Sequence, residues 1–191
     1  MTHMDVFGEV TKQMLIVMVC VCSAFLVIGI MFYVLQAIGL YKTARRRGIY
    51  HAWLAWIPVG SQWVLGAISD QFQYLCRGKK KAKRHLLVWL QILYVALTFC
   101  FGFFGTYFLL QPGYGMLWSM LYGLLLGFGV LYMVFQALAY FDYFHSARPK
   151  RAVCHLVLGL LLPCCMACFV YADRKYDESM PPLAHTEATE D

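Results

Sequence analysis

The chain has 191 residues, of which 61% are hydrophobic and 14% are charged, and its mean hydropathy is +0.61. Soluble domains carry nearer 25% charged residues, so this composition excludes an ordinary soluble protein and indicates an all-α integral membrane protein. The formal net charge is +6. The basic residues cluster beside apolar segments, which favours anionic lipid headgroups rather than nucleic acid as their partner.

The first apolar segment, residues 14–41, exceeds the roughly 20 residues that cross a bilayer. Residues 1–13 lack the basic start of a signal peptide, so the segment is expected to remain as an anchor. A basic stretch follows it directly. Because positive charge gathers on the cytoplasmic side, this helix is expected to run inward, with the N-terminus extracytoplasmic.

The second apolar segment, residues 52–74, is short and is interrupted by Pro58, which disfavours a continuous helix. Basic clusters flank it on both sides. If the segment dips into the bilayer and returns, 15 of the 16 Lys and Arg residues are cytoplasmic and only Lys12 is outside. If it crosses, 6 lie inside and 10 outside. The first distribution is the one that insertion favours, and it predicts a re-entrant or interfacial helix.

Two further full spans are predicted at residues 85–110 and 116–141, joined by a short uncharged turn. The later span carries Gly123, Gly127 and Gly129. Small residues spaced four apart let membrane helices approach closely, so this face is a candidate helix contact.

A second short apolar segment, residues 155–172, is again interrupted by a central proline, Pro163. Two placements remain for it: dipping in and returning, or crossing. The tail at residues 176–191 is polar and acidic without apolar periodicity, and is predicted to be disordered. The C-terminus is expected to be cytoplasmic, like the basic loops.

The predicted architecture is a membrane domain over residues 14–175, with three full transmembrane helices and two proline-broken re-entrant or interfacial helices. The chain also resembles two related halves. A motif containing Gln36 resembles one containing Gln136, and each is followed by a basic loop and a short, proline-broken segment. This favours an internal repeat. The alternative is that two such segments arose independently.

Polar side chains are sparse within the spans. Gln36, Gln91 and Gln136 are the amides there. Their plainest role is a hydrogen bond to a neighbouring helix, and the alternative is a polar path for transport. The spans contain no deeply placed charge, which argues against a proton-coupled transporter. Asp70 and Asp142 are expected at the cytoplasmic ends of helices, solvated or in interfacial ion pairs.

The histidines and cysteines suggest no site. His51, His85, His145 and His155 fall on one boundary of the membrane, but none are paired at helical ligand spacing. The eight cysteines are interpreted as reduced and buried, including the Cys-Cys-x-x-Cys run that begins at Cys164. We predict no catalytic residue, metal site or cofactor.

A polybasic collar is the main candidate for lipid binding, because each basic residue near an anionic leaflet contributes about 1 kcal/mol. The collar consists of Arg45, Arg46, Arg47, Lys79, Lys80, Lys81, Lys83 and Arg84. Its predicted partners are membrane lipids with anionic headgroups, and no nucleic acid. Five further residues are predicted to have structural or polar roles, namely Gln36, Pro58, Asp70, Gln136 and Pro163.

The run Gly-Ile-Tyr-His-Ala-Trp-Leu-Ala-Trp-Ile-Pro at residues 48–58 resembles a motif of small uncharacterised multi-pass membrane proteins of Gram-positive, often gut, bacteria. The run at residues 173–182 is similar to their C-terminal pattern, with Ser179 where that pattern has glycine. The resemblance implies a bacterial plasma membrane and supplies no activity.

Three functional classes remain. The leading one is a non-enzymatic scaffold or accessory subunit at the cytoplasmic membrane face, with a membrane-protein partner or a second copy. The second is a small transporter or channel component built on the duplicated broken helices, which a polar cavity lined by Gln36 and Gln136 would favour. The third is an enzyme on lipid-like substrates, which convergence of His51, His155 and Asp70 would favour.

Overall fold

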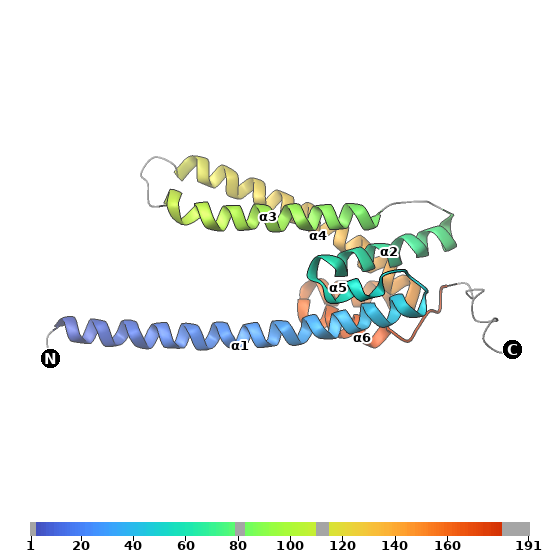
Figure 1. Ribbon diagram of the computed structural model, residues 1–191, viewed down its shortest axis with the longest axis horizontal. Coiled ribbons are helices and arrows are strands. Elements are labelled where there is room, and N and C mark those ends of the chain that lie inside the picture. Colours follow the sequence, from blue (N-terminus) through green and yellow to red (C-terminus); the bar gives the residue numbers. More distant parts are fainter. Residues whose placement is uncertain (1–2, 79–82, 110–114, 181–191) are drawn as a thin grey trace.

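A computed structural model describes residues 3–78, 83–109 and 115–180 of the chain (Figure 1). Within these ranges the protein is built from helices joined by turns and contains no strand. In chain order the elements are α1 (His3–Arg46), the 3₁₀ helix η1 (Ala52–Trp56), α2 (Pro58–Arg77), α3 (Lys83–Leu109), α4 (Gly115–Ala147), α5 (Ala152–Leu161) and α6 (Pro163–Asp173).

Three of the described helices are long and apolar enough to cross a membrane, over Lys12–Arg46, Lys83–Gly105 and Met116–Ala147. The predicted all-α architecture with three long apolar helices is therefore present. The helices run past the predicted span ends because hydropathy marks the apolar stretch, whereas backbone hydrogen bonding continues into the polar flanks. The last residue of the second predicted span and residues 111–114 of the predicted turn lie outside the described residues.

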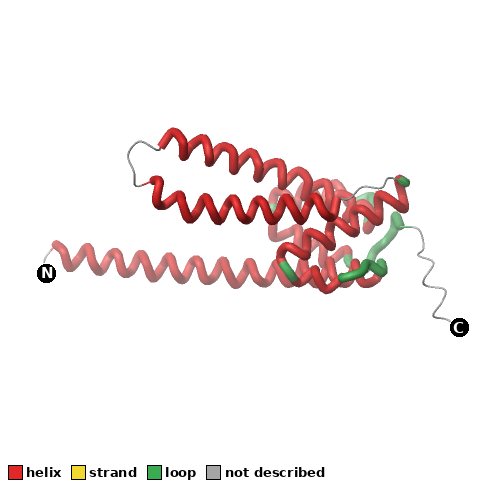
Figure 2. Tube along the Cα trace, turned by 45° about the horizontal axis from the view of Figure 1, so that its top comes forward, coloured by secondary structure: helices red, strands yellow, loops and turns green. Residues whose placement is uncertain are grey.

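The long helices share one packed end. In Figures 1 and 2, the start of α1, the end of α3 and the start of α4 extend to one side of the molecule. The other ends of these helices meet the short helices: α2 packs against α3 and α4, α6 packs against α1, and α5 packs against α4. We call this region the packed end. All of the described basic residues except Lys12 belong to segments at this end.

The predicted breaks at both prolines are present. Ile57 and Leu162 have extended backbones, and Pro58 and Pro163 occupy the first turn of α2 and α6. Proline suits this position because the first N–H groups of a helix have no partner within the helix. The end of α1 is also satisfied locally. Gly48 adopts a left-handed conformation after the last turn, and the N–H of Ile49 donates to the Ala44 carbonyl, 2.9 Å away.

The hydrophobic core lies at the packed end. Leu40, Leu65, Tyr143 and Val170, from α1, α2, α4 and α6, are completely buried. By contrast, residues 12–31 of α1 are exposed; Phe25, for example, is 70% exposed. The core therefore joins the short helices to the long ones, and leaves the outer parts of the spans bare.

Of the three glycines predicted to permit close helix packing, only Gly129 does so: a Cβ atom there would lie 3.2 Å from the Tyr94 ring of α3. A Cβ atom at Gly66 would lie 2.5 Å from the Arg84 Cα atom, and one at Gly39 would lie 2.8 Å from the Val170 carbonyl oxygen. Gly123 and Gly127 have nothing within 4 Å. The predicted contact at these two positions is wrong, because α4 packs chiefly through its other end and through larger side chains.

The predicted disordered tail begins later than expected. Asp177 forms ion pairs with Arg46 and Arg47. The N–H groups of Glu178 and Ser179 donate to carbonyls at the end of α4. Residues 176–180 are therefore fixed across the ends of α1 and α4, because the acidic tail meets basic residues there. Residues 181–191 of the predicted tail lie outside the described residues.

Candidate functional site: a glutamine-lined cavity

A cavity of about 370 Å³ lies between the long helices where they enter the packed end. Four glutamines line it, one from each of α1 to α4: Gln36, Gln62, Gln91 and Gln136. We call it the glutamine cavity. None of the described residues that line it is charged.

Two of the glutamines tie their helices to α4. The Gln36 Nε2 atom donates a hydrogen bond to the Tyr140 hydroxyl, and the Tyr132 hydroxyl donates one to the Gln91 Oε1 atom. The prediction that these two amides bond to a neighbouring helix is confirmed. Buried polar groups need such partners because an unpaired donor or acceptor in an apolar medium is costly.

Gln62 differs from the other three. It is only 6% exposed, and its Oε1 atom has no hydrogen-bond partner among the described residues. Sequence reasoning did not identify Gln62. A usable signal was present, because Gln62, Ser69 and Gln73 recur at the spacing of one helical face in an otherwise apolar segment.

Both helix breaks border the cavity. Pro58 and Ser61, from the first turn of α2, line it beside Gly159 and Met166, which flank the break between α5 and α6. The α2 end is held by side chains, since the Ser61 hydroxyl donates to the Pro58 carbonyl at 2.7 Å and the Tyr33 hydroxyl donates to the Trp56 carbonyl at 2.7 Å.

A buried ion pair below the cavity joins α2, α3 and α4. The Asp142 carboxylate accepts hydrogen bonds from Ser69 at 2.5 Å, from Gln73 at 2.7 Å and from the Lys83 ammonium at 2.7 Å. Asp142 is 3% exposed. Of the two expectations for this residue, the ion pair is confirmed and the solvated helix end is wrong, because the surrounding helices bury the carboxylate and supply a partner charge and two donors.

A second set of polar contacts joins α1 and α4 to the later chain. The Arg47 guanidinium donates to the Ser146 hydroxyl at 2.9 Å and to the Asp177 carboxylate, also at 2.9 Å through Nε. His155 Nδ1 lies 2.8 Å from the Asp173 carboxylate, and Arg148 lies 3.4 Å from it. These groups hold the packed end together and leave no open face for a substrate on Asp173, whose side chain is fully buried.

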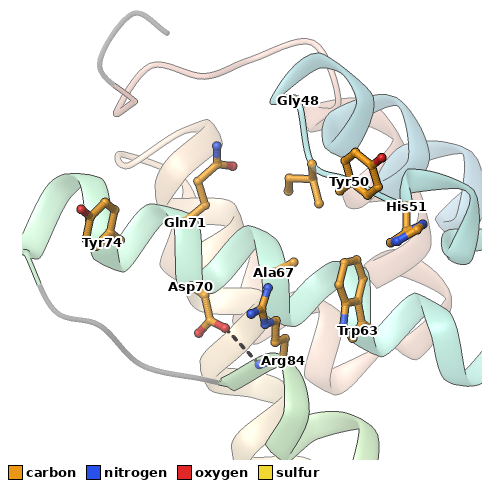
Figure 3. A pocket seen from close by; sticks show the side chains of 10 residues that line it. Gly48, Tyr50, His51, Trp63, Ala67, Asp70, Gln71, Tyr74 and Arg84 are labelled. Carbon is orange, nitrogen blue, oxygen red and sulfur yellow. Dashed lines mark hydrogen bonds between the residues drawn. The ribbon is translucent and has the colours of Figure 1, made fainter.

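A wider, open pocket of about 720 Å³ lies at the packed end between the 48–51 turn, α2 and the start of α3. Figure 3 shows His51, Trp63, Asp70 and Arg84 around it. The Asp70 carboxylate accepts from the backbone N–H groups of Lys83 at 2.9 Å and Arg84 at 3.1 Å. Asp70 therefore caps α3, which satisfies donors that the first turn of a helix leaves free.

The histidines and Asp70 do not converge. His51 and Asp70 border the open pocket, whereas His155 is paired with Asp173. The residues that the structure describes include no group of three His, Cys, Asp or Glu side chains that could hold a metal ion. The cysteines are free, but seven of the eight are exposed at the protein surface, so their predicted burial within the protein is wrong.

The polybasic collar is divided by the fold. Arg47 and Lys83 form ion pairs that are largely enclosed by the protein, whereas Arg46 pairs with Asp177 but keeps an exposed side chain. The side chain of Arg45 is exposed and makes no ion pair with any described residue, and the Arg84 side chain faces the open pocket. The predicted positions Lys79, Lys80 and Lys81 lie outside the described residues.

Comparison of the chain with protein-family models, curated proteins and solved structures finds no match. The features of the chain that can indicate a function are therefore the chemistry of the glutamine cavity and the arrangement of the helices around it.

Proposed function

We propose that the protein is a small transporter or channel component, and that its solute binds in the glutamine cavity. The observation that carries the proposal is the joint lining of one cavity by Gln36 and Gln136, the two amides of the repeated motif. Selectivity in channels and transporters comes from the donors and acceptors that line such a space. A volume of about 370 Å³ lies within the usual range of small-molecule sites.

The two broken helices support this function. Secondary transporters commonly bind their solutes where interrupted helices meet. The break leaves backbone N–H and C=O groups without partners in the helix, and these groups can bind the solute. Here the breaks before Pro58 and Pro163 both border the cavity, through Pro58 and Met166. We propose that both segments are re-entrant and return to the face they entered from.

Contacts between α1 and α4 support the internal repeat. The two glutamine motifs are offset by 100 residues, and the Thr43 and Tyr143 hydroxyls, separated by the same offset, lie 3.3 Å apart. Equivalent residues meet in this way when they lie on the axis that relates two repeats. The short helices follow the same relation, since α6 packs against α1 and α2 packs against α4.

The proposed orientation follows from the charges. The basic segments gather at the packed end, so this end is assigned to the cytoplasmic face of a bacterial plasma membrane and the start of α1 to the outside. We propose that Arg45 and Arg84 contact anionic headgroups there.

Solute flux tests the function. The full chain is reconstituted in proteoliposomes, and the permeability to a panel of neutral and charged small solutes is compared with that of empty vesicles. We expect selective flux that falls at least tenfold when Gln36→Leu and Gln136→Leu are combined. Gln71→Leu is the matched control, because Gln71 is on α2 but does not line the cavity. Vesicles as impermeable as empty ones to every solute would refute the proposal.

Cysteine labelling tests the topology. The native cysteines are first replaced, and single cysteines are then introduced at Lys42, Lys80 and Lys150. We expect all three to react with an impermeant reagent only from the cytoplasmic side. Reaction of position 80 from the outside would mean that α2 crosses the membrane, and would contradict the proposed re-entrant arrangement.

An accessory subunit or scaffold is the second candidate. The apolar window of α1 is not buried at all by the rest of the chain, so this helix offers a whole surface to lipid, to a partner helix or to a second copy. Crosslinking from Phe25 in native membranes tests this candidate. A stoichiometric protein adduct supports it, and labelling of lipid alone argues against it.

A further inference from the structure

We infer that the glutamine cavity binds a small uncharged molecule that donates hydrogen bonds, and that the Gln62 Oε1 atom is its principal acceptor. This inference rests on the proposed function, since it names the class of solute that the cavity takes.

The charge of the lining excludes an ionic ligand. The polar groups that the described residues present to the cavity are amides and hydroxyls, without a carboxylate, guanidinium or ammonium among them. An ion transferred from water into a membrane-embedded site without a counter-charge loses a large hydration energy. A neutral polar molecule loses much less, and amide and hydroxyl groups can replace its bonds to water.

The hydrogen-bond directions favour a donor. The hydroxyl protons of Tyr33, Ser61 and Tyr132 are already donated to acceptors within the protein. Each hydroxyl has one proton and additional lone pairs, so what these side chains retain for a ligand is acceptor capacity. These three hydroxyls therefore favour a molecule that donates N–H or O–H groups, while the amide N–H groups of the lining glutamines can also donate to acceptor atoms of the same molecule.

Gln62 supplies the specific contact. Gln62 lines the cavity, and its side-chain oxygen is buried without a partner among the described residues, whereas the Gln91 oxygen accepts from Tyr132. A buried acceptor left unpaired is costly, and a ligand donor at this position removes that cost. The same bond supplies selectivity, because a ligand without a donor leaves the oxygen unpaired.

The volume limits the ligand to a small molecule. At roughly 30 Å³ for each water molecule, a space of about 370 Å³ holds about a dozen waters. Short polyols and primary amides are of this size and carry the required donors.

Three small probes test the inference on the full chain in lipid nanodiscs, with empty nanodiscs subtracted. Acetamide carries N–H donors, N,N-dimethylacetamide keeps the carbonyl but has no donor, and methylammonium has donors and a positive charge. Saturation-transfer NMR measures the affinity of each. We expect saturable binding of acetamide, and none of the other two.

Gln62→Met tests the assigned acceptor. We expect acetamide affinity to fall about tenfold, the effect of losing one hydrogen bond to a buried group. Gln71→Met is the matched control, because Gln71 also has an unpartnered Oε1 atom on α2 but lines the open pocket. Its acetamide affinity should be unchanged.

The outcomes separate the inference from the proposed function. Three results would overturn the inference. They are saturable binding of methylammonium but not of acetamide, equal binding of the two amides, and an unchanged acetamide affinity in Gln62→Met. If acetamide does not bind but vesicle flux still depends on Gln36 and Gln136, the solute class is wrong and the transport function stands. If flux is also absent, both fail.

Discussion

The two halves of α1 have similar apolar sequences but different surroundings. Leu26, in the outer half, is 63% exposed, whereas Leu40, in the packed end, is completely buried. The outer half is left uncovered by the rest of the described chain, and the inner half meets α6 and η1. An apolar sequence in a membrane protein therefore does not identify its core. The core is identified instead by hydrogen-bonded polar groups and by close helix contacts, and both occur at the packed end.

The largest expected effect comes from the buried ion pair. Lys83→Met leaves the Asp142 carboxylate enclosed without its partner charge, which should reduce the free energy of unfolding by about 3–5 kcal/mol. Chemical denaturation in mixed detergent micelles measures the change. Arg45→Met is the control, because that side chain is exposed and makes no ion pair with a described residue; it should change stability by less than about 0.5 kcal/mol. Equal effects would mean that enclosure of the Lys83–Asp142 pair does not determine its contribution to stability.

A pair of leucines on the same helix compares the two regions directly. Leu40→Ala opens a cavity in the core and should cost about 2–5 kcal/mol. Leu26→Ala removes the same atoms from an exposed position and should cost less than about 0.5 kcal/mol in the same denaturation assay. A large cost at Leu26 would instead indicate that the outer half of α1 packs against another chain.

Glycines extend the comparison to helix packing. Gly66→Ala places a methyl group 2.5 Å from the Arg84 Cα atom and must separate α2 from α3, at a cost of about 1–3 kcal/mol. Gly123→Ala enters open space and should leave the protein equally stable or slightly more so. Thermal unfolding followed by circular dichroism measures both variants. A destabilised Gly123→Ala would show that this face does pack against a helix.

The smallest expected effect is a gain. Gln62→Met removes the unpartnered acceptor and should raise the free energy of unfolding, without ligand, by about 1 kcal/mol. Gln91→Met removes the acceptor of the Tyr132 hydroxyl and should lower it by a similar amount. If thermal unfolding shows that Gln62→Met is stabilised and Gln91→Met is destabilised, Gln62 lowers the stability of the native protein, as functional residues often do. A loss in both variants would mean that Gln62 is bonded within the fold.

The long helices and their breaks followed from local sequence. Hydropathy located three long apolar segments, and Pro58 and Pro163 marked the breaks because proline acts on its immediate neighbours. Gln36 and Gln91 were recognised as bonded amides because an apolar segment leaves an amide few alternatives.

The residues that were missed depend on distant parts of the chain. Nothing near Asp142 indicates that Ser69, Gln73 and Lys83 come together around it from two other helices. Gln62 was not predicted because its segment was assigned to the membrane–water interface, where an exposed glutamine is common. Gly123 and Gly127 were selected by their spacing, although the helix that would contact them lies elsewhere.

The bond between Arg47 and Asp177 sets an order of events during synthesis. The two residues are 130 positions apart, so a ribosome completes every membrane helix before it adds the carboxylate that neutralises this arginine. The contacts of residues 176–180 with the ends of α1 and α4 can therefore form only after α1 to α6 have been synthesised.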